Sequence, residues 1–317
     1  MQKQGSLPYH HKAGAPRPFA NRRVCISRRR GRSDIGGPVQ ANSASAIAEI
    51  PTRLNTIPHE RSTRYFFYND ICQSTEKCLD AGSTLLSVRC TIPELNQNFD
   101  VYRVGTLLEC VREMATMLCK RHGGKVKVCV QQSLGTGVFQ GTPLALSGVR
   151  RILLQMDWGE VSDQIEIGQL GRDQIDDCQT YILISPQNIT GHSVLPLISE
   201  MVDEAHADKK EIIMVNPQLG DIMSSGGVMS VRGRQERMDF ISTFTTAYHF
   251  RLLYIGMGPY PIMGALRYSY GGEWHIYKRV DFKGEDGSPQ ESYDMIQAGK
   301  QEPDSSIITA AFKSSKA

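Results

Sequence analysis

Amide side chains stand at the ends of predicted strands in the middle of this sequence. Gln187 and Asn188 follow the apolar strand predicted over residues 180–185, and Asn216 follows the strand predicted over residues 211–215. Ligands of open α/β sheets bind beyond the carboxyl ends of the strands, so we expect these amides to line a crevice. Because amides are neutral, they would bind a ligand and would not act as acid or base. Capping of loops and turns is the alternative.

A glycine-rich loop with Gly135, Gly137 and Gly141 joins a predicted strand over residues 125–131 to a predicted helix over residues 144–158. In a Rossmann-type phosphate loop, glycines at this place let backbone amides approach a phosphate. The spacing here is GxGxxxG instead of GxGxxG, and the acid expected about 20 positions later is not in its usual place. The loop is therefore either a phosphate or nucleotide site or a tight turn that uses glycine for backbone freedom.

Three arginines, Arg232, Arg234 and Arg237, lie in a predicted loop and at the start of the helix predicted over residues 235–249. They are candidates for binding an anion or an acidic partner, and a solvated loop is the alternative. Tyr260 lies in a stretch broken by glycine and proline and is a candidate for a partner-binding surface, unless it is buried in the core.

The spacing of the histidines, cysteines and serines matches no known catalytic or metal-binding motif. The sequence has no HExxH or CxxC, and Ser185 lacks the GxSxG elbow. We therefore predict no catalytic residue, no metal and no cofactor, and we favour a binding role over an enzymatic one. The eight cysteines are expected to be reduced and structural, with Cys72 and Cys78 as the first pair to consider for redox chemistry.

Alternating strands and helices must position these residues. The predicted strands cover residues 83–91, 125–131, 164–168, 180–185, 211–215 and 250–255, and the predicted helices cover residues 101–121, 144–158, 194–205 and 235–249. A hairpin is predicted from residues 267–270 and 274–281, and a late strand over residues 307–312. This order predicts a three-layer, Rossmann-like α/β domain with a largely parallel central sheet and a C-terminal antiparallel hairpin.

The charge is unevenly distributed along the chain. The net charge of the 317 residues is +3, but residues 1–40 contain nine basic residues and one acidic residue, and residues 41–317 contain 27 basic and 32 acidic residues. An arginine-rich, acid-poor head over residues 1–50 is typical of an organelle transit peptide; a nucleic-acid-binding arm and an inert tail are the alternatives. The acidic body, a single domain over residues 60–317, is not expected to bind nucleic acid.

A series of segments in the body resembles a known family. The segments are Phe99–Glu109, Val126–Gln131, Gly141–Leu146, Arg151–Gly159, Val215–Leu219, Phe250–Tyr254 and Tyr260–Arg267. In this order they resemble the domain of unknown function 1995, which occurs in plastid and cyanobacterial proteins, over about Arg64 to Phe312. Since no catalytic residues are established for this family, none is carried over to this chain.

The resemblance implies a chloroplast protein that assists photosystem II assembly. It implies a role in biogenesis or insertion of the inner antenna chlorophyll protein through contacts with other assembly or thylakoid insertion proteins. The protein would lie in the stroma, with peripheral contact to the thylakoid membrane left open. It also agrees with the transit-peptide interpretation of the head. The alternative from the residues alone is a Rossmann-like protein that binds a nucleotide or phosphate ligand, with a stromal enzyme as one form of it.

Overall fold

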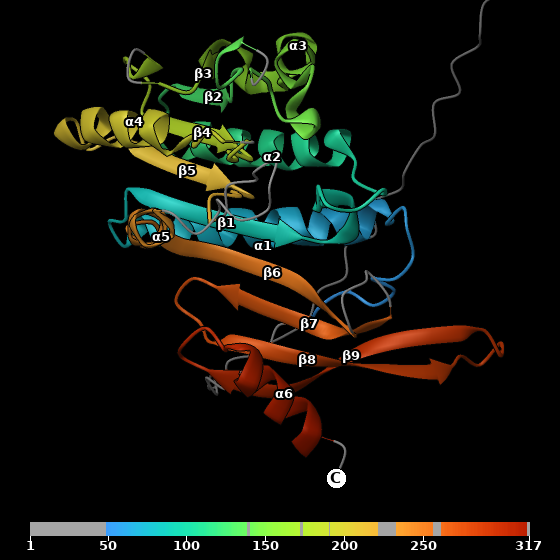
Figure 1. Ribbon diagram of the computed structural model, residues 1–317. Coiled ribbons are helices and arrows are strands. Elements are labelled where there is room, and N and C mark those ends of the chain that lie inside the picture. The colour runs from blue at the N-terminus through green and yellow to red at the C-terminus, as the bar shows by residue number, and fades with distance from the viewer. Residues whose placement is uncertain are drawn as a thin grey trace, which may run out of the picture. The chain divides into compact units, whose positions relative to one another are not determined.

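A nine-stranded mixed sheet forms the centre of the computed structural model (Figure 1). The structure describes residues 49–137, 140–171, 174–189, 191–220, 233–255 and 261–315. The predicted head over residues 1–50 therefore lies almost wholly outside the described residues, and its role stays a prediction. The described residues belong to one compact unit that spans residues 48–317.

Six strands form the parallel part of the sheet, in the spatial order β3-β2-β4-β5-β1-β6. Their bounds are β1 (Leu85–Thr91), β2 (Val126–Val130), β3 (Ile165–Gln169), β4 (Thr180–Ile184), β5 (Glu211–Val215) and β6 (Thr245–Tyr254). β2, β4 and β5 are buried along their whole length, as expected for strands covered on both faces. The predicted α/β class with a largely parallel sheet is confirmed.

The sheet continues with antiparallel strands on the far side of β6. These are β7 (Ile262–Ser269), β8 (Trp274–Lys283) and β9 (Pro289–Gly299). The predicted C-terminal hairpin is therefore confirmed as β7 and β8, with longer strands than expected. β9 was not predicted, because its residues are mostly polar and partly exposed and carry no strong alternation.

Helices cover both faces of the parallel part. On one face lie α1 (Arg61–Asp80), α2 (Val104–His122) and α3 (Val149–Gln155), and on the other lie α4 (Leu195–Ala207) and α5 (Arg234–Ser242). Figure 1 shows α4 and α5 in front of the sheet, with α1 and α2 behind it. A last helix, α6 (Ser305–Ser314), packs Ala311 and Phe312 against Leu253 of β6 and Trp274 of β8. The predicted three layers are thus present in the parallel part.

The predicted helix over residues 235–249 was too long. α5 ends at Ser242, and residues 245–249 already belong to β6. The reason is local composition, because residues 243–250 are mainly threonine and aromatic residues, which favour a strand.

Two further elements differ from the prediction. The predicted helix over residues 144–158 is divided, because Gly148 has a φ of 75° and separates a short 3-10 turn, η3 (Leu144–Leu146), from α3. The predicted strand over residues 307–312 is part of α6. A short apolar run does not distinguish helix from strand, and here the Asp304 side chain caps the helix by accepting bonds from the amides of Ser306 and Ile307.

We predict that Gly264→Ala in β7 destabilises the protein. A Cβ at Gly264 would collide with the backbone of Tyr277 in β8, whose carbonyl carbon would lie 2.9 Å away. We expect a loss of about 1–3 kcal/mol in the free energy of unfolding, measured by chemical denaturation. Gly105→Ala in α2 is the matched control, since nothing lies within 4 Å of its Cβ and alanine is the better helix former. Equal stability losses in the two variants would contradict the prediction.

Candidate functional site

A crevice of about 540 Å³ lies where β1, β4 and β5 end, beside β6 and α5. The predicted residues Gln187, Asn188 and Asn216 all line this crevice. Gln218, another amide that follows the strand over residues 211–215, also lines it, and further residues of its wall that were not predicted are Arg89, Gln97 and Arg251. The structure thus brings together the amides that follow β4 and β5, at the edge of the sheet where an α/β domain holds its ligands.

Asn216 extends the pairing between β5 and β1. Its backbone amide donates to the Val88 carbonyl at 2.8 Å. Its side-chain Oδ1 accepts from the Cys90 amide at 2.7 Å, and its Nδ2 donates to the Cys90 carbonyl at 2.9 Å. The residue is buried and has a φ of 49°, a conformation that asparagine tolerates better than most residues. Asn216 therefore holds the crevice wall in place, and both ends of its amide are already used.

Gln187 and Asn188 are also bound by neighbouring groups. The backbone amide of Gln187 donates to Oε1 of Gln131 at 2.9 Å. The side-chain Nε2 of Gln187 donates to Oε1 of Gln97 at 2.8 Å. Asn188 Oδ1 accepts from the backbone amide of Val194 at 3.0 Å, next to the start of α4, and Nδ2 donates to the Leu219 carbonyl at 2.8 Å. The expected roles in lining a crevice and in capping loops therefore apply to the same residues.

The charged groups on the described wall of the crevice are Arg89 and Arg251. Burial lowers the pKa of Arg251, and the positive charge of Arg89 lowers it further. Arginine keeps its proton near neutral pH even so. The wall can therefore donate hydrogen bonds and hold an anion, while proton transfer is not the chemistry of its side chains.

Sequence reasoning did not find these two arginines. The available signal was the position of Arg89 in a strand whose alternate residues, Leu86, Val88 and Cys90, are fully buried. An arginine at such a place faces the opposite side of the sheet, so period-2 alternation would have pointed to an exposed patch on that side.

The glycines of the predicted phosphate loop lie elsewhere. Residues 134 and 141 pair in an antiparallel bridge, with backbone hydrogen bonds of 2.8 and 2.9 Å, so Gly135 and Gly137 form the turn of a small hairpin. Residues 142–148 separate Gly141 from α3, so the three glycines do not lead directly into a helix N-terminus. Ligand binding by these glycines stays a prediction, and it would not involve the amide-lined crevice.

The predicted partner-binding residues are three arginines and Tyr260. Two of them, Arg232 and Tyr260, lie outside the described residues. Arg234 is exposed at the first position of α5. Arg237 is buried, and its Nε donates to the Gly220 carbonyl at 3.3 Å. Arg234 therefore lies at the surface of α5, where an acidic partner can reach it, while Arg237 joins α5 to the chain after β5.

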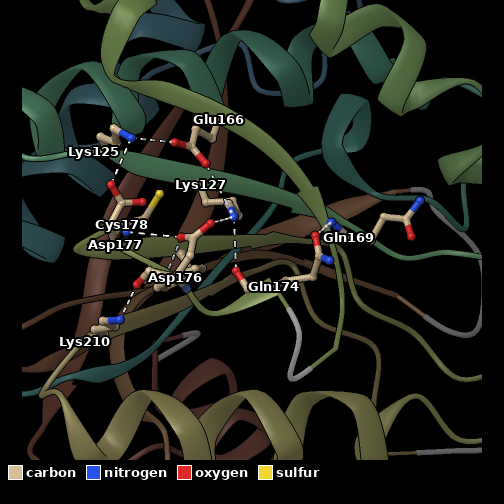
Figure 2. A network of polar contacts seen from close by, with 10 residues as sticks. Lys125, Lys127, Glu166, Gln169, Gln174, Asp176, Asp177, Cys178 and Lys210 are labelled. Carbon is tan, nitrogen blue, oxygen red and sulfur yellow. Dashed lines mark hydrogen bonds and ion pairs between the residues drawn. The ribbon is translucent and has the colours of Figure 1, made fainter.

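A separate acidic cluster lies at the β2–β3–β4 edge of the sheet (Figure 2). Glu166, Asp176, Asp177 and Cys178 bring one ligand atom each to within 4.8 Å of one another. Lysine ammonium groups, however, already occupy this cluster: Lys125 contacts Glu166 and Asp177 at 3.0 Å each, Lys127 contacts Asp176, and Lys210 donates to the Asp176 carbonyl. Lys125 and Lys127 thus pair with all three carboxylates, so the cluster is an ion-pair network and its geometry offers little attraction to a metal.

Lys127 is the most deeply buried lysine of this network. Its side chain passes over Gly168 of β3, where a Cβ would lie 2.8 Å from Lys127 Cδ. Burial is the largest single effect and lowers the pKa of Lys127, but the hydrogen bond and charge of Asp176 together with the charges of Cys178 and Glu166 outweigh it, so the pKa of the lysine is raised. Burial likewise opposes ionisation of Asp176, and the bonds from Lys127 and Cys178 lower its pKa to about 2.

Seven cysteines are described, and all carry free thiols. Burial raises the pKa of Cys72, Cys90 and Cys129 to about 12, so these groups stay protonated and unreactive near neutral pH. In the part of the chain that the structure describes, no helix has the length and apolar character needed to span a bilayer.

We predict that Asn216→Ala destabilises the protein by about 2 kcal/mol, because the amide and carbonyl of Cys90 would lose their partners in a buried place. Chemical denaturation measures the change. The control is Asn98→Ala, an exposed amide on the wall of the same crevice. If Asn216→Ala costs no more than the control, the amide does not support the joint between β5 and β1.

We predict a pH-dependent effect of Asp176→Asn. The pKa of Asp176 is lowered in the folded state, so the ionised carboxylate stabilises the fold. This stabilisation is complete above pH 4 and disappears as the pH falls through 2. The variant should be less stable by about 1 kcal/mol at pH 7, since Asp176 is partly exposed, and should match the wild type near pH 2. Urea unfolding at several pH values measures this, with exposed Asp163→Asn as the control. A difference that does not change with pH would contradict the prediction.

The comparison with protein families agrees with the resemblance noted above. The family model described as "Domain of unknown function (DUF1995)" matches residues 61–309. The match begins with α1, covers every strand of the sheet and ends within α6, so it includes the crevice and the acidic cluster. The chain therefore belongs to the DUF1995 family.

Proposed function

We propose that this protein acts by binding, as a chloroplast factor that assists photosystem II assembly through contacts with other assembly or thylakoid insertion proteins. The observation that supports a binding role is the chemistry of the crevice. Its polar wall consists mainly of amides and two arginines, which recognise a partner through hydrogen bonds and charge.

The cellular part of the proposal rests on two features of the chain. Membership in the DUF1995 family supports it, since the resemblance to plastid and cyanobacterial proteins implies a role in biogenesis or insertion of the inner antenna chlorophyll protein. The arginine-rich residues 1–40 supply an N-terminus of the kind that directs import into an organelle. In this proposal the folded body works in the stroma, and contact with the thylakoid membrane is peripheral.

A second candidate function is the binding of a nucleotide or another phosphate ligand. The position of the crevice favours it, because it lies beyond the carboxyl ends of parallel strands and contains two guanidinium groups. The glycine loop adds little to this candidate, since Gly135 and Gly137 lie in a small hairpin and residues 142–148 separate this loop from α3. A thermal-shift screen with nucleotides and sugar phosphates distinguishes the two candidates, because a ligand at about 100 times its dissociation constant adds about 2.7 kcal/mol of stability.

We predict that the tagged full-length chain, recovered from isolated chloroplasts, carries photosystem II assembly or insertion proteins with it. Combined Arg232→Glu and Arg234→Glu should reduce this recovery about fivefold or more, as expected when about 1 kcal/mol of charge attraction to an acidic partner is lost. Quantitative mass spectrometry of the recovered proteins measures the effect. Combined Arg150→Glu and Arg151→Glu, the same charge change at two exposed positions of α3, is the control and should leave the recovery unchanged.

Two results would contradict the proposal. One is recovery of no photosystem II protein together with normal photosystem II levels in a plant that lacks the gene. The other is a cytosolic location of a reporter protein fused to residues 1–60, which would exclude a chloroplast role.

A further inference from the structure

Arg89 and Arg251 form a pair of like charges on one face of the sheet. Arg89 of β1 is opposite His249 of β6, and Thr91 is opposite Arg251, so the two arginines are diagonal neighbours on adjacent strands. Both line the crevice. The carboxylate that most raises the pKa of Arg251 belongs to exposed Glu302, and no ion pair joins these two residues within the described part of the chain.

Arg89 is exposed and Arg251 is half-buried, and several arginines that are half-buried or buried elsewhere in this domain are paired with carboxylates. Arg267 forms two hydrogen bonds to Asp70, of 2.7 and 2.8 Å, and Arg121 contacts both Asp80 and Glu211. Arg279 contacts Asp281 at 2.8 Å and Glu291 at 3.1 Å. Among the described residues, Arg89 and Arg251 have no such carboxylate partner. Their neighbour His249 is buried, and burial together with these two charges lowers its pKa to about 3. Within the described residues, this face therefore carries two positive charges with no carboxylate paired to them.

A hydrogen-bond donor without a partner lies in the same wall. Gln97 accepts the bond from Gln187 through Oε1, which leaves its Nε2 buried and without a hydrogen bond. A buried N–H group without a partner costs free energy, about 1–3 kcal/mol, unless a bound molecule accepts from it. Gln97 and the two arginines line one cavity, so a single anionic group can satisfy all three.

An apolar groove continues from this site. A second cavity, of about 690 Å³, shares Thr91, Asn96 and Arg251 with the crevice and lies between β6, β7 and α6. Its wall is mostly apolar, and its apolar residues include Phe99, Leu253, Met263, Ile308 and Phe312. The volumes of the two cavities are in the usual range for sites of small molecules, about 300–1,000 Å³. A ligand that fills both must be anionic at one end and apolar along the rest.

We propose that the paired arginines Arg89 and Arg251, with Gln97, bind the carboxylate of a long-chain fatty acid whose acyl chain lies in the groove between α6 and the sheet. Two guanidinium groups match the two oxygens of a carboxylate, which accept charge-assisted hydrogen bonds. The chain gains from leaving water, by about 0.8 kcal/mol for each buried CH₂ group. A single chain fits a groove bounded by one helix and two strands, and Arg251, which lines both cavities, is the residue at which head and chain join.

The test is isothermal titration of the purified full-length chain with oleate, below the concentration at which oleate forms micelles. We expect binding to one site and a dissociation constant about tenfold or more higher after combined Arg89→Gln and Arg251→Gln, because charge-assisted bonds are lost. Combined Arg150→Gln and Arg151→Gln on α3, both exposed, is the charge-matched control and should bind as the wild type does. Methyl oleate, which has the chain without the charge, should bind more weakly than oleate by a similar factor.

A second variant tests the groove itself without changing the arginines. Thr309 is exposed on α6 and lines the apolar cavity. Thr309→Glu places an acidic group in this cavity. The new glutamate lies four residues before Lys313, and a Glu–Lys pair at this spacing stabilises a helix. It should weaken oleate binding and leave the unfolding temperature unchanged. Octanoate should bind more weakly than oleate in the wild type, because its shorter chain fills less of the groove.

Three results would overturn the proposal. The first is the absence of oleate binding, and the second is binding that is the same in the arginine variant and the wild type. The third is a preference for another occupant, seen as arginine-dependent binding of an acidic peptide, of inorganic phosphate or of phosphatidylglycerol vesicles without binding of free oleate. These measurements use the purified chain, so their failure leaves the proposed role in photosystem II assembly open to its own test.

Discussion

The fold depends on the burial of β1 between two strands that come much later in the chain. A central strand must satisfy its backbone donors and acceptors on both edges, so β5 and β6 have to run parallel to it in a defined register. The last pair between β1 and β5 joins Val88 to Val215, and the side chain of Asn216 then replaces the next backbone pair by bonding to both polar groups of Cys90. Because β1 continues beyond this point, its end forms the floor of a crevice.

The two faces of the sheet explain why the crevice is open. The face that carries Leu86 and Val88 is covered by α1 and α2, and both side chains are fully excluded from water. On the other face, α5 covers the start of the β1–β6 region and α6 covers β8, and cavities remain between them. Figure 1 shows this separation, with α5 and α6 lying over different parts of the sheet. The polar and charged residues of β1 and β6 lie on the side that these helices leave uncovered.

β4 and β5 were predictable because each is a short, nearly continuous apolar run, and the helix over residues 104–122 was predictable because its apolar residues recur at helical spacing. α1 was not predicted from the sequence, since its buried residues include polar Ser74 and Thr75 and its apolar stripe is weak. The amides at the strand ends were found from strand order alone. Arg89 and Arg251 were not found from the sequence, because a single charged residue in a strand indicates a binding site only when the residues of the partner strand beside it are known. That partner is decided by pairing across more than 100 residues.

The late arrival of the partners of β1 has a consequence for how the chain is made. Leu86 pairs with Ile213 and Thr245, so during synthesis from the N-terminus β1 emerges long before either neighbour exists. At about 5–20 residues per second, the wait for β5 is on the order of 10 s. Throughout that time an apolar strand with two unsatisfied edges can associate with other chains. The topology therefore leaves β1 without its neighbours in the nascent chain until β5 has been made, and no fragment that stops before β5 can assemble the centre of the sheet.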